Sequence, residues 1–344
     1  MSSLPTLAIV ERNWHRLRSP LCLLGAPGGA GGSGCDDLRC VTMHYGDWQR
    51  HGGHERRWYF GYDDDAIPFS FESIVIFMPK AGAELRLRFA WAVSRLARGG
   101  DLWLVGERRG GIGGGARRFR EQFPHACKVD NARHCQLWKA EALDEPSDRA
   151  FHPRDWLTYR ELTAAGLSLT LPGMPGLFSD GHADRGTEML LGTIEQCPAE
   201  PVLDFGCGNG LIGAWLGCRW PGLKMTLSDV QWQALCCARA ALGQSDNVSI
   251  CASDGLDAIE PGYSAILTNP PFHQGVDRDA AATQNLIRRA PDFLVPGGEL
   301  RLVANAFLPY PRLLREAFHE PDILADDGRY RVYRVQRKRH SRRK

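Results

Sequence analysis

Four consecutive residues, Asn269-Pro270-Pro271-Phe272, combine a polar amide, two prolines and an aromatic ring. They follow the apolar run Ile266-Leu267-Thr268. Because proline has no N–H for a sheet ladder and restricts the residue before it, a strand must end near Thr268. The Asn269 amide and the Phe272 ring would then lie on a stiff turn at the carboxyl end of that strand, where open α/β sheets bind ligands. A turn without function would look the same, so the interpretation depends on a second site upstream.

That second site is a loop with glycines at alternate positions. A short apolar strand ends at Asp204, and Gly206, Gly208 and Gly210 then lead into a helix. Such glycines let the backbone turn tightly and pass close to a ligand. A dinucleotide loop is the alternative, but the carboxylate of Asp204 would repel a pyrophosphate. It suits a cationic ligand instead, such as the amino group or the sulfonium of S-adenosylmethionine.

Acidic residues also follow the next two predicted strands. Asp229 comes after the strand 224–227, about twenty residues beyond the glycine loop, where an acid suits a ribose diol. Asp254 comes after the strand 248–252, where an acid can accept a hydrogen bond from the adenine amino group. Each acid alone could be a simple helix N-cap. Three acids and an amide at four strand ends together predict a site for S-adenosylmethionine as the cofactor.

The elements around these residues occur twice in the chain. A strand ending at a proline, a helix, a Gly-Gly pair and a second strand span residues 73–106, and the same order spans residues 266–303. We infer an internal duplication of an α/β domain. Where the second copy has Asn269 to Phe272, the first has Met78-Pro79-Lys80-Ala81, without the amide and the ring. The first copy is therefore predicted to be catalytically inactive.

Turn and linker signals set the expected domain boundaries. The glycines from Gly110 to Gly115 are too loosely spaced for a dinucleotide fingerprint and are interpreted as a loop. The polar, proline-containing stretch 142–155 is typical of a linker, and a hairpin over 156–171 would open the next domain. We expect domains at residues 1–148 and 149–344.

Composition restricts the class of protein further. The formal net charge is +2, but six basic residues lie in 337–344, so a basic tail extends from a mildly acidic body. Such a tail suggests a phosphate-rich partner, although a solvated tail would look the same. The eleven cysteines show no zinc-type spacing, so no metal is expected. No signal peptide or membrane span is apparent, which favours a cytoplasmic protein without a membrane partner.

The motifs resemble a known family. The segments 204–210 and 269–273, the pair Phe178-Ser179 and the long block 298–310 closely resemble ribosomal RNA guanine-N2 methyltransferases of the RsmC type, which are class I S-adenosylmethionine-dependent enzymes. The resemblance implies two tandem Rossmann-type domains with mainly parallel seven-stranded sheets, the first degenerate and used to bind substrate and stabilise the chain. It implies a guanine of small-subunit ribosomal RNA as substrate, and a monomer is expected.

The same resemblance assigns roles to individual residues. Cofactor contacts fall on Asp204, Gly206, Gly208, Asp229 and Asp254, and contacts with the base fall on Asn269, Pro270 and Phe272. Gly210, the last glycine of the loop, is predicted to be a further cofactor-binding residue.

Chemically, Asn269 Oδ1 and the Pro270 carbonyl can accept the two protons of an exocyclic amine, and Phe272 can stack on the base. Positioning then supplies most of the catalysis. Three alternatives stay open: methylation of adenine or a protein glutamine, methylation of a large-subunit guanine, and a non-catalytic RNA-binding assembly factor.

Overall fold

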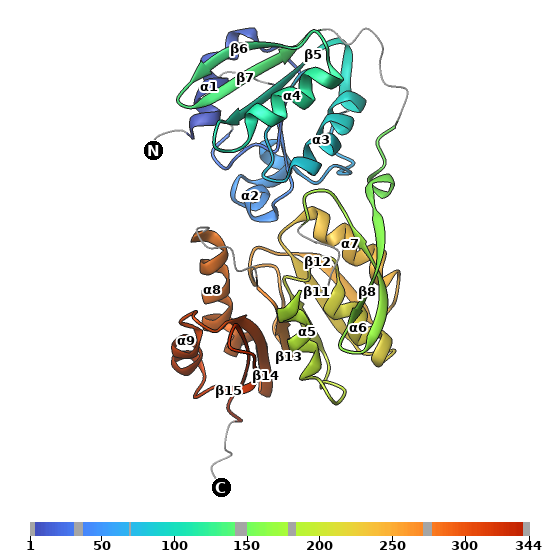
Figure 1. Ribbon diagram of the computed structural model, residues 1–344, viewed down its shortest axis with the longest axis vertical. Coiled ribbons are helices and arrows are strands. Elements are labelled where there is room, and N and C mark those ends of the chain that lie inside the picture. The colour runs from blue at the N-terminus through green and yellow to red at the C-terminus, as the bar shows by residue number, and fades with distance from the viewer. Residues whose placement is uncertain are drawn as a thin grey trace. The chain divides into compact units, whose positions relative to one another are not determined.

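The computed structural model describes residues 4–30, 37–68, 70–141, 150–177, 184–270 and 277–339. The chain forms two compact units, Met1–Leu157 and Thr158–Lys344, which we call unit 1 and unit 2 (Figure 1). The domain boundary expected at 148–149 lies outside the described residues. Within the described ranges, no helix is long and apolar enough to cross a membrane.

Unit 1 is built on a seven-stranded sheet in the order β3-β2-β1-β4-β5-β7-β6. The first five strands of this order are parallel, and β7 and β6 are antiparallel to their neighbours. The strands are β1 (Leu21–Leu24), β2 (Leu38–Thr42), β3 (Trp58–Phe60), β4 (Phe71–Phe77), β5 (Leu96–Glu107), β6 (Cys127–Ala132) and β7 (Cys135–Ala140). The α-helices are α1 (Pro5–Arg12), α2 (Tyr45–Arg50), α3 (Gly82–Arg95) and α4 (Ile112–Gln122).

Unit 2 repeats this sheet, in the order β12-β11-β10-β13-β14-β16-β15, with the same parallel and antiparallel pairs. Its strands are β10 (Val202–Phe205), β11 (Met225–Asp229), β12 (Val248–Ala252), β13 (Tyr263–Thr268), β14 (Leu294–Asn305), β15 (Asp322–Asp326) and β16 (Tyr330–Gln336). Its α-helices are α5 (Arg185–Gly192), α6 (Leu211–Arg219), α7 (Trp232–Leu242), α8 (Asp277–Phe293) and α9 (Tyr310–Ala317). The sequence-based fold class, two α/β units with mainly parallel seven-stranded sheets, is confirmed.

The expected hairpin precedes this second sheet. Strands β8 (Thr158–Ala164) and β9 (Leu167–Gly173) pair antiparallel around a two-residue turn. Both turn residues, Ala165 and Gly166, have positive φ angles of 42° and 82°. Turns of this handedness match the twist of the strands they join, which explains a glycine at this point.

Alternation along the central strands of unit 2 gives the sheet two apolar faces. Val202 and Leu267 pack with helices α5, α6 and α7, whereas Leu203 and Ile266 pack with α8 and α9. Helices α8 and α9 lie side by side (Figure 1). Because helices cover both faces of the sheet, successive residues of a strand are apolar, and apolar and polar residues do not alternate along it. Polar side chains are therefore concentrated at the strand ends.

The register of the two sheets shows that the units are equivalent residue by residue. Leu21 opens β1 and pairs with Ser73 of β4, and Val202 opens β10 and pairs with Ala265 of β13. Extending both ladders makes Phe77 the counterpart of Asn269. The sequence comparison had placed Met78 against Asn269, which is wrong by one residue. The strand pairing determines which residues of the two units correspond. A comparison of sequences that sets Pro79 against Pro270 is displaced from this correspondence by one residue.

The glycines from Gly110 to Gly115 do not form only a loop, so that interpretation is wrong in part. Helix α4 begins at Ile112 and includes the last three of them. At Gly115 a Cβ would lie 2.6 Å from the sulfur of Met78. Close packing of the helix against the end of β4 thus explains a glycine inside a helix, where it is otherwise unfavourable.

Candidate functional site

The glycine loop of unit 2 joins the carboxyl end of β10 to the start of α6. Gly206, Gly208 and Gly210 all have positive φ angles, of 71°, 55° and 85°. The loop is held against β11, because the N–H groups of Gly206 and Cys207 both donate to the carbonyl of Ser228. A Cβ at Gly206 or Gly208 would meet no atom within 4 Å. The loop therefore presents an open backbone surface at the sheet edge.

Asp204 lies beneath this loop and is almost completely buried, with 1% of its surface exposed. Its Oδ2 accepts a hydrogen bond of 3.2 Å from the N–H of Gly213, in the first turn of α6. Its Oδ1 has no hydrogen-bond partner within the described part of the chain. Burial, with a smaller contribution from the charge of Asp229, raises the pKa of the Asp204 carboxyl to about 7. A cationic ligand would stabilise the charged form of this group.

Asp229 and Asp254 lie at the ends of the next two strands. Asp229 closes β11, and its two carboxylate oxygens accept from the N–H groups of Gly208, at 3.0 Å, and Gln231, at 2.9 Å. Asp254 follows β12 by two residues and is half-buried. Since β12, β11, β10 and β13 are neighbours in the sheet, the three predicted acids and Asn269 occupy adjacent strand ends.

The amide of Asn269 is held in one orientation. Its Nδ2 donates to Asp184 Oδ2 at 2.8 Å and to Thr187 Oγ1 at 2.6 Å. A carboxylate can only accept hydrogen bonds, so the amino group of the amide must face Asp184 and the carbonyl must face away. Asn269 Oδ1 is buried and has no hydrogen-bond partner among the described residues. The side chain thus offers a fixed, unused acceptor.

Asp184 and Thr187 were not identified from the sequence. Asp184 caps α5, because its Oδ1 accepts from the N–H groups of Gly186 and Thr187, while its Oδ2 accepts from the Thr187 hydroxyl. An aspartate before a predicted helix is a recognisable capping signal. Its second contact, with Asn269, joins residues 85 positions apart and leaves no signal in the sequence.

Of the other two residues predicted to contact the base, the structure describes Pro270 but not Phe272. Pro270 is buried directly after Asn269, and the preceding Thr268 donates its hydroxyl to the carbonyl of Phe205, which joins β13 to β10 at this edge. Phe272 lies outside the described residues, as does the pair Phe178-Ser179. The described residues contain no group of three or more metal-ligating side chains.

In unit 1, the sheet edge that corresponds to this site carries different side chains. Gly25, the counterpart of Gly206, has the same φ of 71°, but a Cβ there would lie 1.8 Å from a guanidinium nitrogen of Arg88. Arg88 is buried, bonds twice to Glu84 Oε1 at 2.7 and 3.0 Å, and donates to the carbonyl of Phe77 at 2.6 Å. The space that is open in unit 2 is filled by an ion pair in unit 1.

Comparison with known proteins agrees with this architecture. The family model described as methyltransferase small domain matches residues 168–334, and the model described as methyltransferase small domain N-terminal matches residues 9–159. The protein of T. thermophilus described as 16S rRNA N2 G1207 methyltransferase (RsmC), in complex with AdoMet and guanosine, has a similar fold, with a TM-score of 0.79. The match covers 92% of this chain and 88% of that one, at 20% sequence identity.

Sequence relatives extend over nearly the full length of the chain. Ribosomal RNA small subunit methyltransferase C of Pseudomonas aeruginosa is 36% identical over 341 residues, which cover 97% of this chain and 99% of the relative. The protein of the same name from Hahella chejuensis is 39% identical over 290 residues, covering 83% of each chain. The sequence identity over nearly the whole chain shows that it belongs to the ribosomal RNA small subunit methyltransferase C family.

Proposed function

We propose that this protein transfers a methyl group from S-adenosylmethionine to the exocyclic N2 amine of a guanine in 16S ribosomal RNA. The relatives are named as methyltransferases of small-subunit ribosomal RNA, and the T. thermophilus protein with a similar fold is described as a 16S rRNA N2 G1207 methyltransferase in complex with AdoMet and guanosine. The observation in this chain that carries the proposal is the fixed amide of Asn269, which lies one strand away from the buried acid Asp204.

Four features of unit 2 suit the donor. The buried Oδ1 of Asp204, which lacks a partner among the described residues, would accept from its ammonium group, and the open glycine loop would run along it. Asp229 would bind the ribose diol, because it closes β11 directly beside the glycine loop, whose Gly208 N–H donates to it. Asp254 would accept from the adenine amino group. When bound, the donor supplies an electrophilic methyl group on a sulfonium.

The role of Asn269 is to orient the amine that attacks. Because Asp184 and Thr187 fix its amino group, Asn269 Oδ1 accepts one proton of the guanine N2 amine, and the Pro270 carbonyl accepts the other. Both acceptors favour a pyramidal nitrogen whose lone pair is directed at the methyl carbon. Precise placement of this kind supplies most of the rate enhancement, so no strong base is required before transfer. Phe272 is expected to stack on the guanine.

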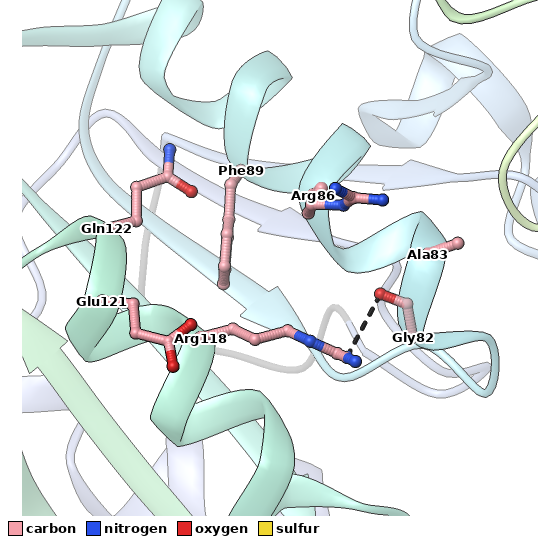
Figure 2. Close-up of a pocket in the computed structure, with 7 residues that line it drawn as sticks. All are labelled: Gly82, Ala83, Arg86, Phe89, Arg118, Glu121 and Gln122. Atoms are coloured by element: carbon pink, nitrogen blue, oxygen red, sulfur yellow. Dashed lines mark hydrogen bonds between the residues drawn. The ribbon is translucent and has the colours of Figure 1, made fainter.

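Unit 1 is proposed to hold the substrate RNA and to stabilise the chain. Its helices α3 and α4 line a cavity of about 620 Å³ that includes Arg86 and Arg118 (Figure 2). Arg118 donates to the carbonyl of Gly82 at 3.4 Å, and Glu121, which lines the same cavity, pairs with Arg117 at 3.8 Å rather than with Arg86 or Arg118. Arginines that are exposed and not neutralised suit RNA phosphates.

The expected setting of the reaction is the small ribosomal subunit in the cytoplasm. A structured RNA is needed to present a guanine outside its helix, because unpairing a base costs a few kcal/mol. We propose that a single chain is sufficient, since the residues assigned to the donor and to the amine all come from unit 2.

The test is to incubate the protein with tritiated S-adenosylmethionine and small subunits that lack the modification. Large subunits, free ribosomal RNA and DNA serve as parallel substrates. We expect label in small-subunit RNA, recovered after digestion as N2-methylguanosine. Label in adenosine or in protein, or labelling of large subunits alone, would refute the proposal. The double variant Arg86→Gln/Arg118→Gln should still bind the donor but should bind small subunits more weakly and with less dependence on salt.

A further inference from the structure

An aromatic side chain projects into solvent at the same sheet edge as Asn269. Phe307 is 68% exposed, which is the largest exposed fraction recorded for a large apolar side chain in the described residues. It lies in the turn between β14 and α9, where the N–H of Leu308 donates to the carbonyl of Asn305 at 3.0 Å. The N–H of Ala306 donates to the carbonyl of Arg329 at 2.8 Å. The backbone under Phe307 is therefore held on both sides.

The position of this turn relates it to the proposed reaction. Strands β13 and β14 are parallel neighbours, and Thr268 pairs with Leu302, so β14 continues beyond the point where β13 ends. A Cβ placed on Gly186 would contact both Val303 and Asn269, which shows that these two side chains lie close together. Phe307 follows Val303 by four residues, a span of at most ~14 Å of extended chain. It thus lies on the rim next to the amine-binding turn.

The charges around Phe307 indicate what it can contact. Strand β15 ends at Asp326, and the neighbouring turn between β15 and β16 contains Asp327 and Arg329. Asp326 pairs with Arg331 at 2.6 Å, and Asp327 pairs with Arg185 at 3.1 Å. Arg329 is exposed in the same turn, with its guanidinium 5.1 Å from the centroid of the Tyr330 ring, so the rim keeps a positive charge that can attract phosphate. An aromatic face beside such a charge suits an unpaired nucleotide, because its base can stack on the ring and its phosphate can lie near the arginine.

We propose that Phe307 stacks on an RNA base next to the target guanine and so helps to hold that guanine displaced from its helix. The inference rests on the proposed function and adds a subsite for an unpaired neighbouring nucleotide. Stacking on a side chain compensates for part of the stacking that the displaced strand loses. A preformed turn makes this contact efficient, since little conformational freedom is lost on binding.

The experiment compares three variants of Phe307 in the full-length protein, with small subunits as the varied substrate and saturating donor. Phe307→Ala and Phe307→Leu should raise KM for small subunits roughly 5- to 100-fold, which corresponds to the ~1–3 kcal/mol of stacking per base. Phe307→Trp should retain a KM at or below that of the natural protein. Donor affinity and thermal stability should not change in any of them. Tyr159→Ala, which removes an aromatic ring that is 57% exposed on the separate hairpin, is the matched control.

Each outcome distinguishes the subsite from the proposed function. If the natural protein methylates small subunits but Phe307→Ala leaves KM within twofold, the subsite is refuted and the function stands. If Phe307→Leu behaves like the natural protein, the contact is apolar packing, and stacking is refuted. If the natural protein does not methylate small subunits at all, the proposed function itself fails.

Discussion

Units 1 and 2 share one topology and one register, yet they differ at the edge where ligands bind. The ladders allow a direct comparison of corresponding residues. In unit 1 these positions hold apolar or uncharged side chains where unit 2 has its acids and amide: Leu23 for Asp204, Thr42 for Asp229, Tyr62 for Asp254 and Phe77 for Asn269. The fold therefore does not require the acids, so their presence in unit 2 needs a chemical explanation.

The difference extends beyond single residues. Between β10 and β11, unit 2 has helix α6, whose first turn binds Asp204 through the N–H of Gly213. Between β1 and β2, residues 25–30 and 37 are described, and they contain no helix. Arg88 fills the space beside Gly25 instead. The comparison shows that one copy can keep its sheet while a buried ion pair fills the space that is open in the other copy.

The largest effect is expected from removing the amide. Asn269→Ala, or Asn269→Phe, which copies the residue of unit 1, should lower kcat about 10²- to 10³-fold, because the amine loses a fixed acceptor. Donor affinity measured by calorimetry should stay within a few-fold, since the proposed donor contacts are on other strands. Normal turnover by either variant would contradict the role assigned to Asn269.

The next prediction concerns the buried ion pair between Arg88 and Glu84 in unit 1. Arg88→Leu should lower the free energy of unfolding by ~3–5 kcal/mol, because it leaves the Glu84 carboxylate buried without its partner. Glu84→Leu/Arg88→Leu should recover part of that loss. Denaturant titration followed by fluorescence measures both.

Neither variant should create a second donor site, so calorimetry should still give one donor per chain. A second equivalent would show that Arg88 alone had kept unit 1 from binding the donor.

A smaller effect is expected from the residues that hold Asn269. Asp184→Ala should lower kcat ~10- to 100-fold with little change in donor affinity, because the charge-assisted hydrogen bond that orients the amide is worth ~1.5–3 kcal/mol. Thr187→Val should have a milder effect of the same kind. Loss of the helix cap costs ~1 kcal/mol of stability, which thermal unfolding will separate from the kinetic effect. An unchanged kcat in Asp184→Ala would contradict the assignment.

The last prediction concerns how the stability of the chain without donor depends on pH. The pKa of Asp204 is raised to about 7 in the folded chain, above its ordinary value near ~3.9, so the folded state binds more protons in this interval. The contribution of this group to stability is complete below pH ~4 and is lost as pH rises through ~7, by at most ~4 kcal/mol. Without donor, Asp204→Asn should therefore show a flatter dependence of unfolding free energy on pH between 5 and 8. Parallel curves would contradict the raised pKa.

The sequence was sufficient to predict much of this architecture. Apolar runs that stop at prolines or acids predict buried parallel strands and their ends, which is why Asp204, Asp229 and Asn269 were identified. The turn residues Ala165 and Gly166 likewise predict their hairpin. These signals are local, because a strand end or a turn is defined by residues that adjoin in the chain.

Features that depend on tertiary contacts were not predictable. A glycine at position 115 of α4 is explained by its close approach to Met78, which is a tertiary contact. The exact counterpart of Asn269 depends on strand pairing, and the orientation of its amide depends on Asp184, which is distant in sequence. The burial of Arg88 follows from its contacts with Glu84 and the carbonyl of Phe77, and a single charged residue in a helix gives no indication of that.

The buried Arg88 has a consequence for how such a duplicated chain can evolve. Once a guanidinium occupies the ligand space and bonds to the backbone of β4, restoring an acid at Leu23 would not reopen that space. Removing the guanidinium first would destabilise the fold before any ligand could compensate. Reopening this edge of unit 1 would thus pass through less stable intermediates, so we expect that single substitutions would not readily produce a ligand site there.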